Sequence, residues 1–334
     1  MAEERLLASF HSIMRMRHFS VRTEKSYRAW IVRYVRFCGM RHPRDCGSAE
    51  IGRFLDHLAT VDEVAAATQN QAFAALLFLY RTVLAIPMAD VPAYARAKRG
   101  TRLPEVLDPA DVAAVLEQLD GMQLTIAKLL YGTGLRLTEA VSLRAKDIDL
   151  ERRVVIVHDG KGGKDRKSVL PTALVEPLRA QLEVVRRRHH RDIALGAVGS
   201  WLPGALDRKY PSASRDWRWA WLFPSGNFVR SKRAIGKFRW HVYPTTVQRA
   251  VSTAARAAQI NKRVTPQIFR HSFATQLLRS GYDIRTVQVL LGHRDVTTTM
   301  IYLHVLETGT GVRSPLDLLE APARPRLGRV HGEE

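Results

Sequence analysis

Cysteine is scarce in this chain of 334 residues, which has only Cys38 and Cys46. Two cysteines without a C-x-x-C spacing give neither a disulfide framework nor a zinc or thiol redox site. Long apolar runs are also lacking: the longest, at residues 72–80, ends at Arg81 and falls well short of the ~20 residues that cross a bilayer. The N-terminus has no readable signal or transit peptide. These absences predict a cytoplasmic protein in a reducing compartment, with no membrane association.

Acidic residues are few: 32 Asp and Glu stand against 52 Lys and Arg, a formal net charge of +20. Residues 217–282 contain twelve Lys or Arg and no Asp or Glu. This excess predicts binding of a polyanion, DNA or RNA, driven by release of condensed counterions. Anionic lipid would be attracted by the same charge, and a basic surface without a partner is the alternative. The lack of carboxylates in this stretch argues against a nuclease that holds magnesium there.

Residues 1–86 predict a four-helix N-terminal domain, because apolar side chains recur at three- and four-residue spacing. Ser20 or Thr23 can cap the second helix, Ser48 is the expected N-cap of the third, and a fourth extends from about Thr68. Residues 87–104 predict an interdomain linker that can lie on a phosphate backbone. Its marks are Pro87, Pro92, Pro104 and a run of basic residues that includes Lys98 and Arg99.

Residues 105–320 predict a second domain, mixed α/β, followed by a C-terminal tail at 321–334. A helix is expected from Asp108 to about Tyr131, and strands at 154–157 and 167–170 form a hairpin with lysines at its glycine-rich tip. Further helices are expected at 173–191 and from Thr246, Pro266 and Ile284. The predicted fold is therefore mainly α with a small β-sheet.

Three short motifs contain side chains that could act in catalysis. Arg136 follows a glycine turn in Thr-Gly-Leu-Arg, with Glu139 three residues on to hold it. Arg270 lies in Arg-His-Ser-Phe-Ala-Thr near the start of a helix, where the backbone N–H groups favour an anion. His293 ends Leu-Leu-Gly-His, and Tyr302 follows nine residues later. Each motif alone is equally consistent with a structural role, but the ordered set is uncommon.

Together with a lysine on the hairpin tip, this ordered set resembles the tyrosine recombinases, or phage-type integrases. The resemblance covers nearly the whole chain. It implies a four-helix core-binding domain and a mixed α/β catalytic domain that form a C-shaped clamp on DNA. The segment at about 195–245, with Trp201, Lys209 and Trp221, resembles the added segment of integron integrases.

The resemblance implies site-specific DNA recombination through a 3′-phosphotyrosyl intermediate formed by Tyr302. Arg136 and Arg270 would fork onto the phosphate oxygens, His293 would add a hydrogen bond, and Lys161 would protonate the leaving 5′-oxygen, with Lys164 as the competing lysine. Fixed cations of this kind suit the more negative five-coordinate transition state. Neither metal nor ATP nor any other cofactor is then expected.

The inserted segment has an unusual density of tryptophan: five of the six in the chain fall within forty residues. Aromatic faces stack on unpaired bases at about 1–3 kcal/mol each. Integron integrases recombine folded single strands as well as duplex DNA, so Trp219, Trp240 and His241 are candidates for contacting protruding bases of a hairpin site. Trp217, Trp221 and Phe223 are assigned to packing. The remaining expected DNA ligands are Lys98, Arg99, Lys164, Lys209 and Arg239.

The short apolar patch at Leu316, Leu318 and Leu319 predicts docking into a neighbouring protomer, as in relatives, and hence a homotetramer on two DNA sites. Docking onto its own domain is the alternative. Two other functions remain open. One is a phage or transposon integrase, or a topoisomerase-like enzyme, that acts on duplex DNA; the other is a DNA-binding regulator with weakened catalysis.

Gln267 departs from the family pattern, which usually has histidine three residues before the second arginine. An amide can donate a hydrogen bond to a phosphate oxygen but cannot take up a proton. We therefore expect Gln267 to keep a binding role and to lack a general-base role. Gln267→His is predicted to raise the rate of DNA cleavage, measured as covalent protein–DNA adduct against time; an unchanged rate would contradict this hypothesis.

Overall fold

A computed structural model describes residues 2–88, 92–98, 105–158, 165–202, 206–210, 212–230 and 236–303. The chain divides into two compact units, one ending at Arg102 and the other beginning at Leu103. This division falls within the stretch predicted as the linker.

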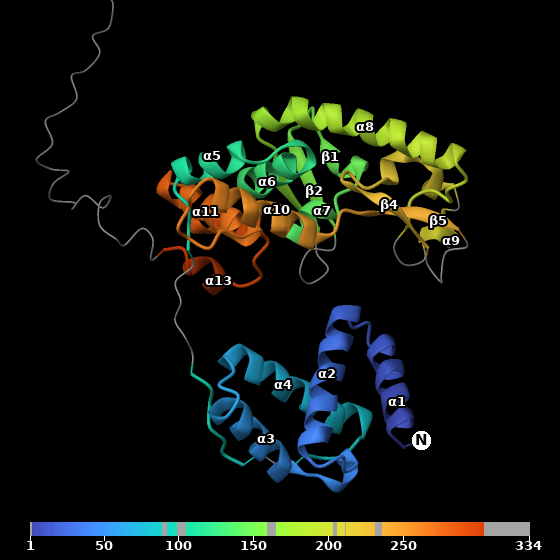
Figure 1. The fold of residues 1–334 in the computed structure, drawn as a ribbon, viewed down its shortest axis with the longest axis vertical. Coiled ribbons are helices and arrows are strands. Elements are labelled where there is room, and N and C mark those ends of the chain that lie inside the picture. The colour runs from blue at the N-terminus through green and yellow to red at the C-terminus, as the bar shows by residue number, and fades with distance from the viewer. Residues whose placement is uncertain are drawn as a thin grey trace, which may run out of the picture. The chain divides into compact units, whose positions relative to one another are not determined.

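The first unit contains four α-helices, as the apolar periodicity predicts (Figure 1). They are α1 (Ala2–Met16), α2 (Val21–Phe37), α3 (Ser48–Thr60) and α4 (Ala66–Phe78), continued by a π-helical turn at Leu79–Val83. The Ser20 side chain caps α2 by accepting a hydrogen bond from the Thr23 N–H, as expected. The N-cap of α3 is Gly47 rather than Ser48, because the Glu50 carboxylate accepts the Gly47 N–H at 2.8 Å.

Apolar side chains from all four helices form the core of this unit. Its fully buried members include Phe10, Met14, Ile31, Tyr34, Ile51, Phe54, Leu55, Leu58 and Leu76. Residues 92–98 lie against the same unit, since the buried Gln69 amide donates to the Ala95 carbonyl at 2.7 Å and accepts the Ala97 N–H at 3.0 Å. Lys98 follows this docked stretch and is exposed.

The second unit begins with two helices where the sequence predicts one. The structure ends α5 (Pro109–Glu117) before a break and starts α6 (Gly121–Thr133) after it. The single helix expected over 108–131 is therefore wrong. Gly121 has a φ of +47°, a left-handed conformation that glycine adopts without a steric penalty, and it opens α6 after Asp120.

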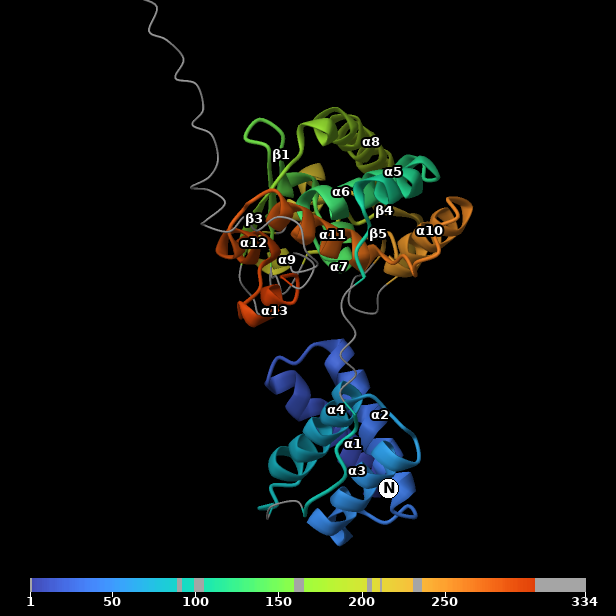
Figure 2. The same cartoon turned by 90° about the vertical axis from the view of Figure 1, so that its left-hand side faces the viewer.

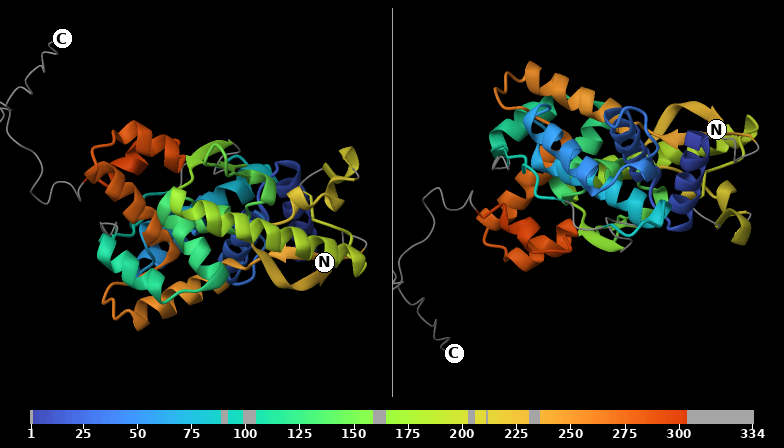
Figure 3. Two further views of the ribbon diagram at one scale, coloured as in Figure 1. Left: turned by 90° about the horizontal axis from the view of Figure 1, so that it is seen from above. Right: turned by 90° about the horizontal axis from the view of Figure 1, so that it is seen from below.

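Four of the remaining helices begin within a few residues of the predicted positions: α8 (Val175–Ala194), α10 (Pro244–Ala257), α11 (Pro266–Arg279) and α12 (Ile284–Leu291). Three short helices complete the unit among the described residues: α7 (Leu137–Val141), α9 (Leu206–Lys209) and α13 (Thr297–Met300). The sequence did not predict α9 or α13. Helix α8 runs along one face of the second unit (Figures 1 and 3). Helix α12 lies beside strand β3 (Figure 2) and also packs on α11.

The predicted hairpin is present as strands β2 (Val154–Val157) and β3 (Arg166–Val169). These strands are antiparallel, with Val155 opposite Ser168, and a short strand β1 (Ile148–Asp149) extends the sheet beyond β2. The Ser168 hydroxyl donates to the Thr133 carbonyl at 2.7 Å, which holds β3 against the end of α6. The tip of the hairpin lies outside the described residues.

A second, two-stranded antiparallel sheet occupies the inserted segment, where no strand was predicted. It consists of β4 (Pro224–Arg230) and β5 (Lys237–His241), and it lies below the C-terminal part of α8 in Figure 1. Trp221 and Phe223 just before β4 are buried, in agreement with the packing role assigned to them. Trp217, in the 3₁₀ turn Trp217–Trp219, contacts Arg186 of α8 and is half-buried.

No helix among the described parts of the chain is long and apolar enough to span a bilayer.

Gly134 provides a test of the packing between α6 and α11. It ends α6 with a φ of +66°, and a Cβ at this position would lie 2.5 Å from the Phe273 ring. Gly134→Ala should therefore add an overpacking penalty of about 1–3 kcal/mol to the ~1–2 kcal/mol cost of a left-handed alanine. Gly121→Ala is the matched control, because its Cβ would meet open space.

Urea unfolding of the second unit can be followed by tryptophan fluorescence, since five of the six tryptophans lie there. We expect the unfolding midpoint of Gly134→Ala to fall clearly below that of Gly121→Ala. Equal midpoints would mean that the close approach of Phe273 does not constrain this turn.

Candidate active site

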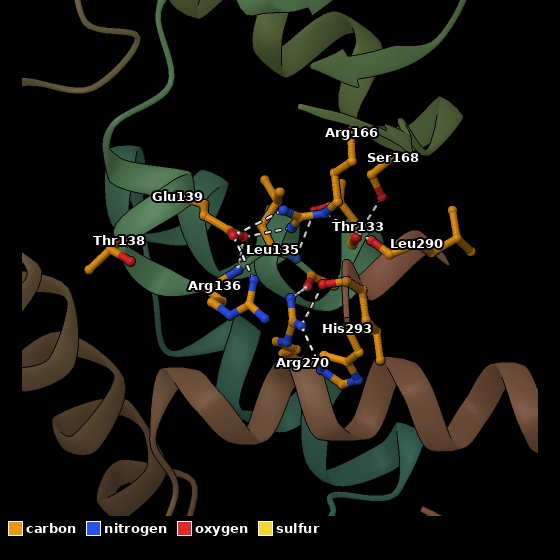
Figure 4. Close-up of polar contacts among 12 residues, drawn as sticks. Thr133, Leu135, Arg136, Thr138, Glu139, Arg166, Ser168, Arg270, Leu290 and His293 are labelled. Atoms are coloured by element: carbon orange, nitrogen blue, oxygen red, sulfur yellow. Dashed lines mark hydrogen bonds and ion pairs between the residues drawn. The ribbon is translucent and has the colours of Figure 1, made fainter. Parts of the chain in front are cut away.

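Arg136 sits at the start of α7, where Glu139 holds it as predicted (Figure 4). The Glu139 carboxylate accepts the Arg136 backbone N–H and its guanidinium, both at 2.8 Å. Arg166, from the first position of β3, donates to both oxygens of the same carboxylate at 3.0 and 2.6 Å. One carboxylate thus links two arginines that lie thirty residues apart in the sequence.

Glu139 stays ionised despite its burial. Burial alone would raise the pKa of this carboxyl group, but the hydrogen bonds from Arg166 and from the Arg136 backbone outweigh it and lower the pKa to about 2. Arg166 also donates to the Leu290 carbonyl at 3.2 Å, which connects β3 to the end of α12. Glu139 and Arg166 together fix the direction in which Arg136 points.

Arg270 on α11 is 1% exposed and is the largest fully buried side chain among the described residues. Its guanidinium donates to the Gly134 carbonyl, to the Leu291 carbonyl at 2.7 Å, and to His293 Nε2 at 3.0 Å. Burial, followed by the charge of Arg136, lowers the pKa of Arg270 to about 10, so the guanidinium remains charged at neutral pH. The turns that carry Arg136 and His293 therefore meet at this one side chain.

His293 lies in the turn after α12 and has a partner at each ring nitrogen. Nε2 accepts from Arg270, and Nδ1 lies 2.9 Å from the Thr299 hydroxyl of α13. Burial and the charge of Arg270 lower the pKa of His293 to about 4, so the ring is neutral at pH 7. Since arginine can only donate, the proton of this neutral ring is on Nδ1.

Tyr302 is 1% exposed and packs in a small apolar cluster with Phe273, Leu278 and Leu291. Its ring is stacked nearly parallel to His293, with 6.5 Å between the ring centroids. Its hydroxyl lies 2.8 Å from His271 Nδ1. Burial raises the pKa of Tyr302, although the charges of Arg270 and Arg136 oppose this effect.

Four of the six residues predicted as catalytic are thus brought together: Arg136, Arg270, His293 and Tyr302. Gln267 occupies the first turn of α11, and its side chain is exposed. Lys161, with its competitor Lys164, lies outside the described residues. The structure therefore gives no position for the predicted general acid.

Sequence reasoning missed three polar residues of this site. Arg166 looks like an ordinary strand residue, and nothing in its spacing points to Glu139, 27 residues earlier. Thr299 lies in a run of three threonines without a distinguishing mark. His271 stands within the Arg-His-Ser motif itself, and its place next to Arg270 was the available signal.

A second candidate feature is a cavity of about 460 Å³ that extends from Glu139 toward the inserted segment. Trp201, Trp219 and Trp221 line it, together with Arg144 and Lys146. Lys146 Nζ lies 4.4 Å from the centroid of the half-buried Trp219 ring, and the Arg144 guanidinium lies 4.0 Å from that of Trp221. Aromatic faces, two cations and the carboxyl groups of Glu139, Asp147 and Asp165 thus line a hollow beside the arginine site.

Trp240 and His241 belong to an aromatic cluster. Trp240 contacts Trp201 and Trp221 with centroids 5.2 and 5.4 Å apart, and His241 Nδ1 lies 2.7 Å from the Val242 carbonyl. Both rings are half-buried, and base contact by either stays a prediction.

Arg239 is engaged within the protein. Its guanidinium is paired with the buried carboxylate of Asp192 on α8 and with carbonyls of β4. It therefore ties the inserted sheet to α8, and DNA contact by Arg239 stays a prediction. Lys209 and Lys98 are exposed, as DNA contacts require, while Arg99 lies outside the described residues.

The arginine site has the chemistry of a pocket for a phosphate anion. Three guanidinium groups and one carboxylate leave a formal charge of two positive units, with two neutral imidazoles and a tyrosine hydroxyl beside them. Among the described residues, no group of three or more His, Cys, Asp or Glu side chains is placed to hold a metal ion.

Comparison with known proteins gives the family. The phage integrase family matches residues 105–308, and the N-terminal SAM-like domain of phage integrases matches residues 6–90. An "Integrase/recombinase" of Escherichia coli is 46% identical over 316 residues, covering 94% of each chain. The tyrosine recombinase XerD of Mycobacterium leprae is 32% identical over 309 residues, covering 86% of this chain and 87% of the relative.

Solved structures share the fold. The Tn1549 transposon integrase, in complex with transposon right end DNA, superposes with a TM-score of 0.62 at 17% identity over 95% of this chain and 97% of the other. XerH bound to its difH substrate gives a TM-score of 0.55 at 18% identity over 86% and 78%. The predicted fold class is confirmed. The chain belongs to the phage integrase family, the tyrosine recombinases, which carry out site-specific recombination by cleaving and rejoining DNA strands.

Proposed function

We propose that Tyr302 is the nucleophile of this recombinase and that Arg136, Arg270 and His293 hold the phosphate it attacks. The observation that carries the proposal is the chain of contacts from Arg270 through His293 to the Tyr302 ring, within a pocket of net positive charge. Attack of Tyr302 Oη on phosphorus leaves a 3′-phosphotyrosyl bond. That bond retains the energy needed to rejoin a different strand.

The charge of the pocket matches the reaction. A phosphodiester carries one negative charge, and the five-coordinate state formed on attack by a phenolate carries two. Arg136, Arg166 and Arg270 less Glu139 supply two positive charges at fixed positions. Preorganised cations of this kind stabilise a transition state without rearranging as it forms. We therefore infer that cleavage needs neither metal nor ATP and no other cofactor, with Lys161 as the acid for the 5′-oxygen and Gln267 as a phosphate ligand.

We propose that the substrates include folded single-stranded hairpin sites, as in integron cassette integration and excision, besides duplex DNA. The support is the cavity beside Glu139, where Trp219 presents a ring already contacted by Lys146. A base that protrudes from a hairpin could stack there at about 1–3 kcal/mol while basic side chains hold the flanking phosphates.

We also propose a homotetramer on two DNA sites, in the cytoplasm at the nucleoid. The tetramer rests on the apolar patch at Leu316, Leu318 and Leu319, which lies outside the described residues. Lys98 and Lys209, both exposed, are proposed as further phosphate contacts.

The first prediction of this proposal concerns the covalent intermediate. In EDTA and without ATP, the wild-type protein should form a denaturation-resistant adduct with a nicked or hairpin DNA site. Tyr302→Phe should form none, because it removes only the attacking oxygen. An adduct in the variant, or an EDTA-sensitive one in the wild type, would overturn the assignment. Tight DNA binding by the wild type without any adduct would instead support a regulator.

The second prediction concerns the inserted segment. Trp219→Ala should slow cleavage of a hairpin with protruding bases by roughly 5- to 150-fold, the equivalent of ~1–3 kcal/mol, and leave a fully paired site nearly unaffected. Trp217→Ala is the control, since Trp217 packs against α8 and should not discriminate between the two substrates. Equal losses on both substrates in Trp219→Ala would contradict base recognition.

A further inference from the structure

We propose that His271 is the proton acceptor for Tyr302 during DNA cleavage. The proposal rests on the assignment of Tyr302 as nucleophile above. It adds a catalytic residue that stands within the Arg-His-Ser motif but received no role from the sequence.

The geometry places His271 on the reacting atom. Its Nδ1 lies 2.8 Å from Tyr302 Oη, and the two ring centroids are 5.4 Å apart. His271 directly follows Arg270 on α11, so one turn of helix presents a phosphate ligand and a base to the same reaction. The accepting atom of a base must lie within about 2.6–3.2 Å of the atom that carries the proton, and His271 meets this condition before DNA is bound.

Among the residues that the structure describes, the other candidate groups of the site are not available for this step. Both nitrogens of His293 are engaged, one by Arg270 at 3.0 Å and the other by Thr299 at 2.9 Å. Gln267, at the position where the family usually has histidine, is exposed and has no basic nitrogen. The arginines remain protonated throughout.

The protonation states are also appropriate. Burial raises the pKa of Tyr302, so its phenolate is rare at neutral pH and attack needs a base. Burial and then the charge of Arg270 lower the pKa of His271 to about 4, so its ring is neutral above that pH and Nδ1 can accept a proton. The charged and titratable groups facing the pair are Arg136, Arg270 and His293.

Substrate binding makes His271 a stronger base. A phosphate held by Arg136 and Arg270 offsets the positive potential that lowers the pKa of His271. The pKa therefore rises toward the ordinary value for histidine as the reacting group arrives, and the affinity for a proton increases at the stage where transfer occurs.

The step balances as an ordinary transesterification. The Tyr302 Oη–phosphorus bond forms as the bond from phosphorus to the 5′-oxygen breaks. The phenolic proton moves to His271 Nδ1, and the 5′-oxygen takes a proton from the general acid. In rejoining, the 5′-hydroxyl attacks, and His271 returns its proton to Tyr302 as that oxygen leaves.

The test uses single-turnover cleavage of a nicked site whose leaving 5′-oxygen is replaced by sulfur. Sulfur leaves without protonation, so the cleavage rate no longer depends on the general acid and reports on the base alone. His271→Asn keeps a polar acceptor near the position of Nδ1 but cannot take a proton. We expect it to cleave this substrate about 100-fold or more slowly than wild type, the lower range for loss of a general base.

The pH profile separates a base from a merely structural residue. With the sulfur substrate, the wild-type rate should be nearly flat from about pH 8 to 9, because neutral His271 predominates there even when bound phosphate raises its pKa to the ordinary histidine value of about 6.5. In His271→Asn the rate should rise with pH, since hydroxide must now generate the phenolate. His190→Asn, an exposed histidine on α8, is the matched control and should behave as wild type.

Chemical rescue by imidazole distinguishes loss of the base from a folding defect. His271→Ala should regain activity in proportion to added neutral imidazole, and His190→Ala should not respond. A wild-type rate and a flat profile in His271→Asn would overturn the proposal while leaving Tyr302 as nucleophile. Slow cleavage with a flat profile and no rescue would likewise reject the base role. Absence of any adduct in the wild type would remove the proposed function itself.

Discussion

The burial of Arg270 is the constraint on which the rest of the candidate active site depends. A guanidinium that is 1% exposed must find acceptors within the protein, because an unpaired buried charge costs several kcal/mol. It finds them in the carbonyl groups of Gly134 and Leu291 and in His293. Gly134 lies at the end of α6, while Leu291 and His293 lie at the end of α12. Satisfying one side chain therefore brings the Arg136 turn and the end of α12 together, and His293 in turn contacts Thr299 of α13, just before Tyr302.

The same burial sets the protonation of the surrounding groups. His293 and His271 are kept neutral by desolvation and by the charge of Arg270, and Glu139 is kept ionised because two arginines share it. A cationic pocket made only of arginines keeps its charge over the whole physiological pH range. The neutral imidazoles beside it can accept protons, whereas the arginines cannot. The arginines therefore stabilise negative charge, and the histidines are the groups able to transfer a proton.

Much of this organisation is readable from the sequence. Helical periodicity gave the first unit, the β-branched run at 154–157 gave the hairpin, and the Arg136–Glu139 spacing gave a contact that the structure confirms. The features that the sequence did not predict depend on tertiary contacts. Arg166 reaches Glu139 only because β3 packs against α6, and the β4–β5 sheet forms where glycine, serine and lysine give no clear strand pattern. The break before Gly121 was missed although Asp120-Gly121 is a dipeptide typical of turns.

The central claim is that Tyr302 makes the covalent bond to DNA. The packing of helices α11, α12 and α13 places this buried tyrosine beside the arginine pocket. The most direct measurement is to trap the protein on a nicked site, digest the adduct, and identify by mass spectrometry which residue carries the nucleotide. The account predicts that the modification lies on Tyr302. A nucleotide on another tyrosine, or on a serine, would contradict it.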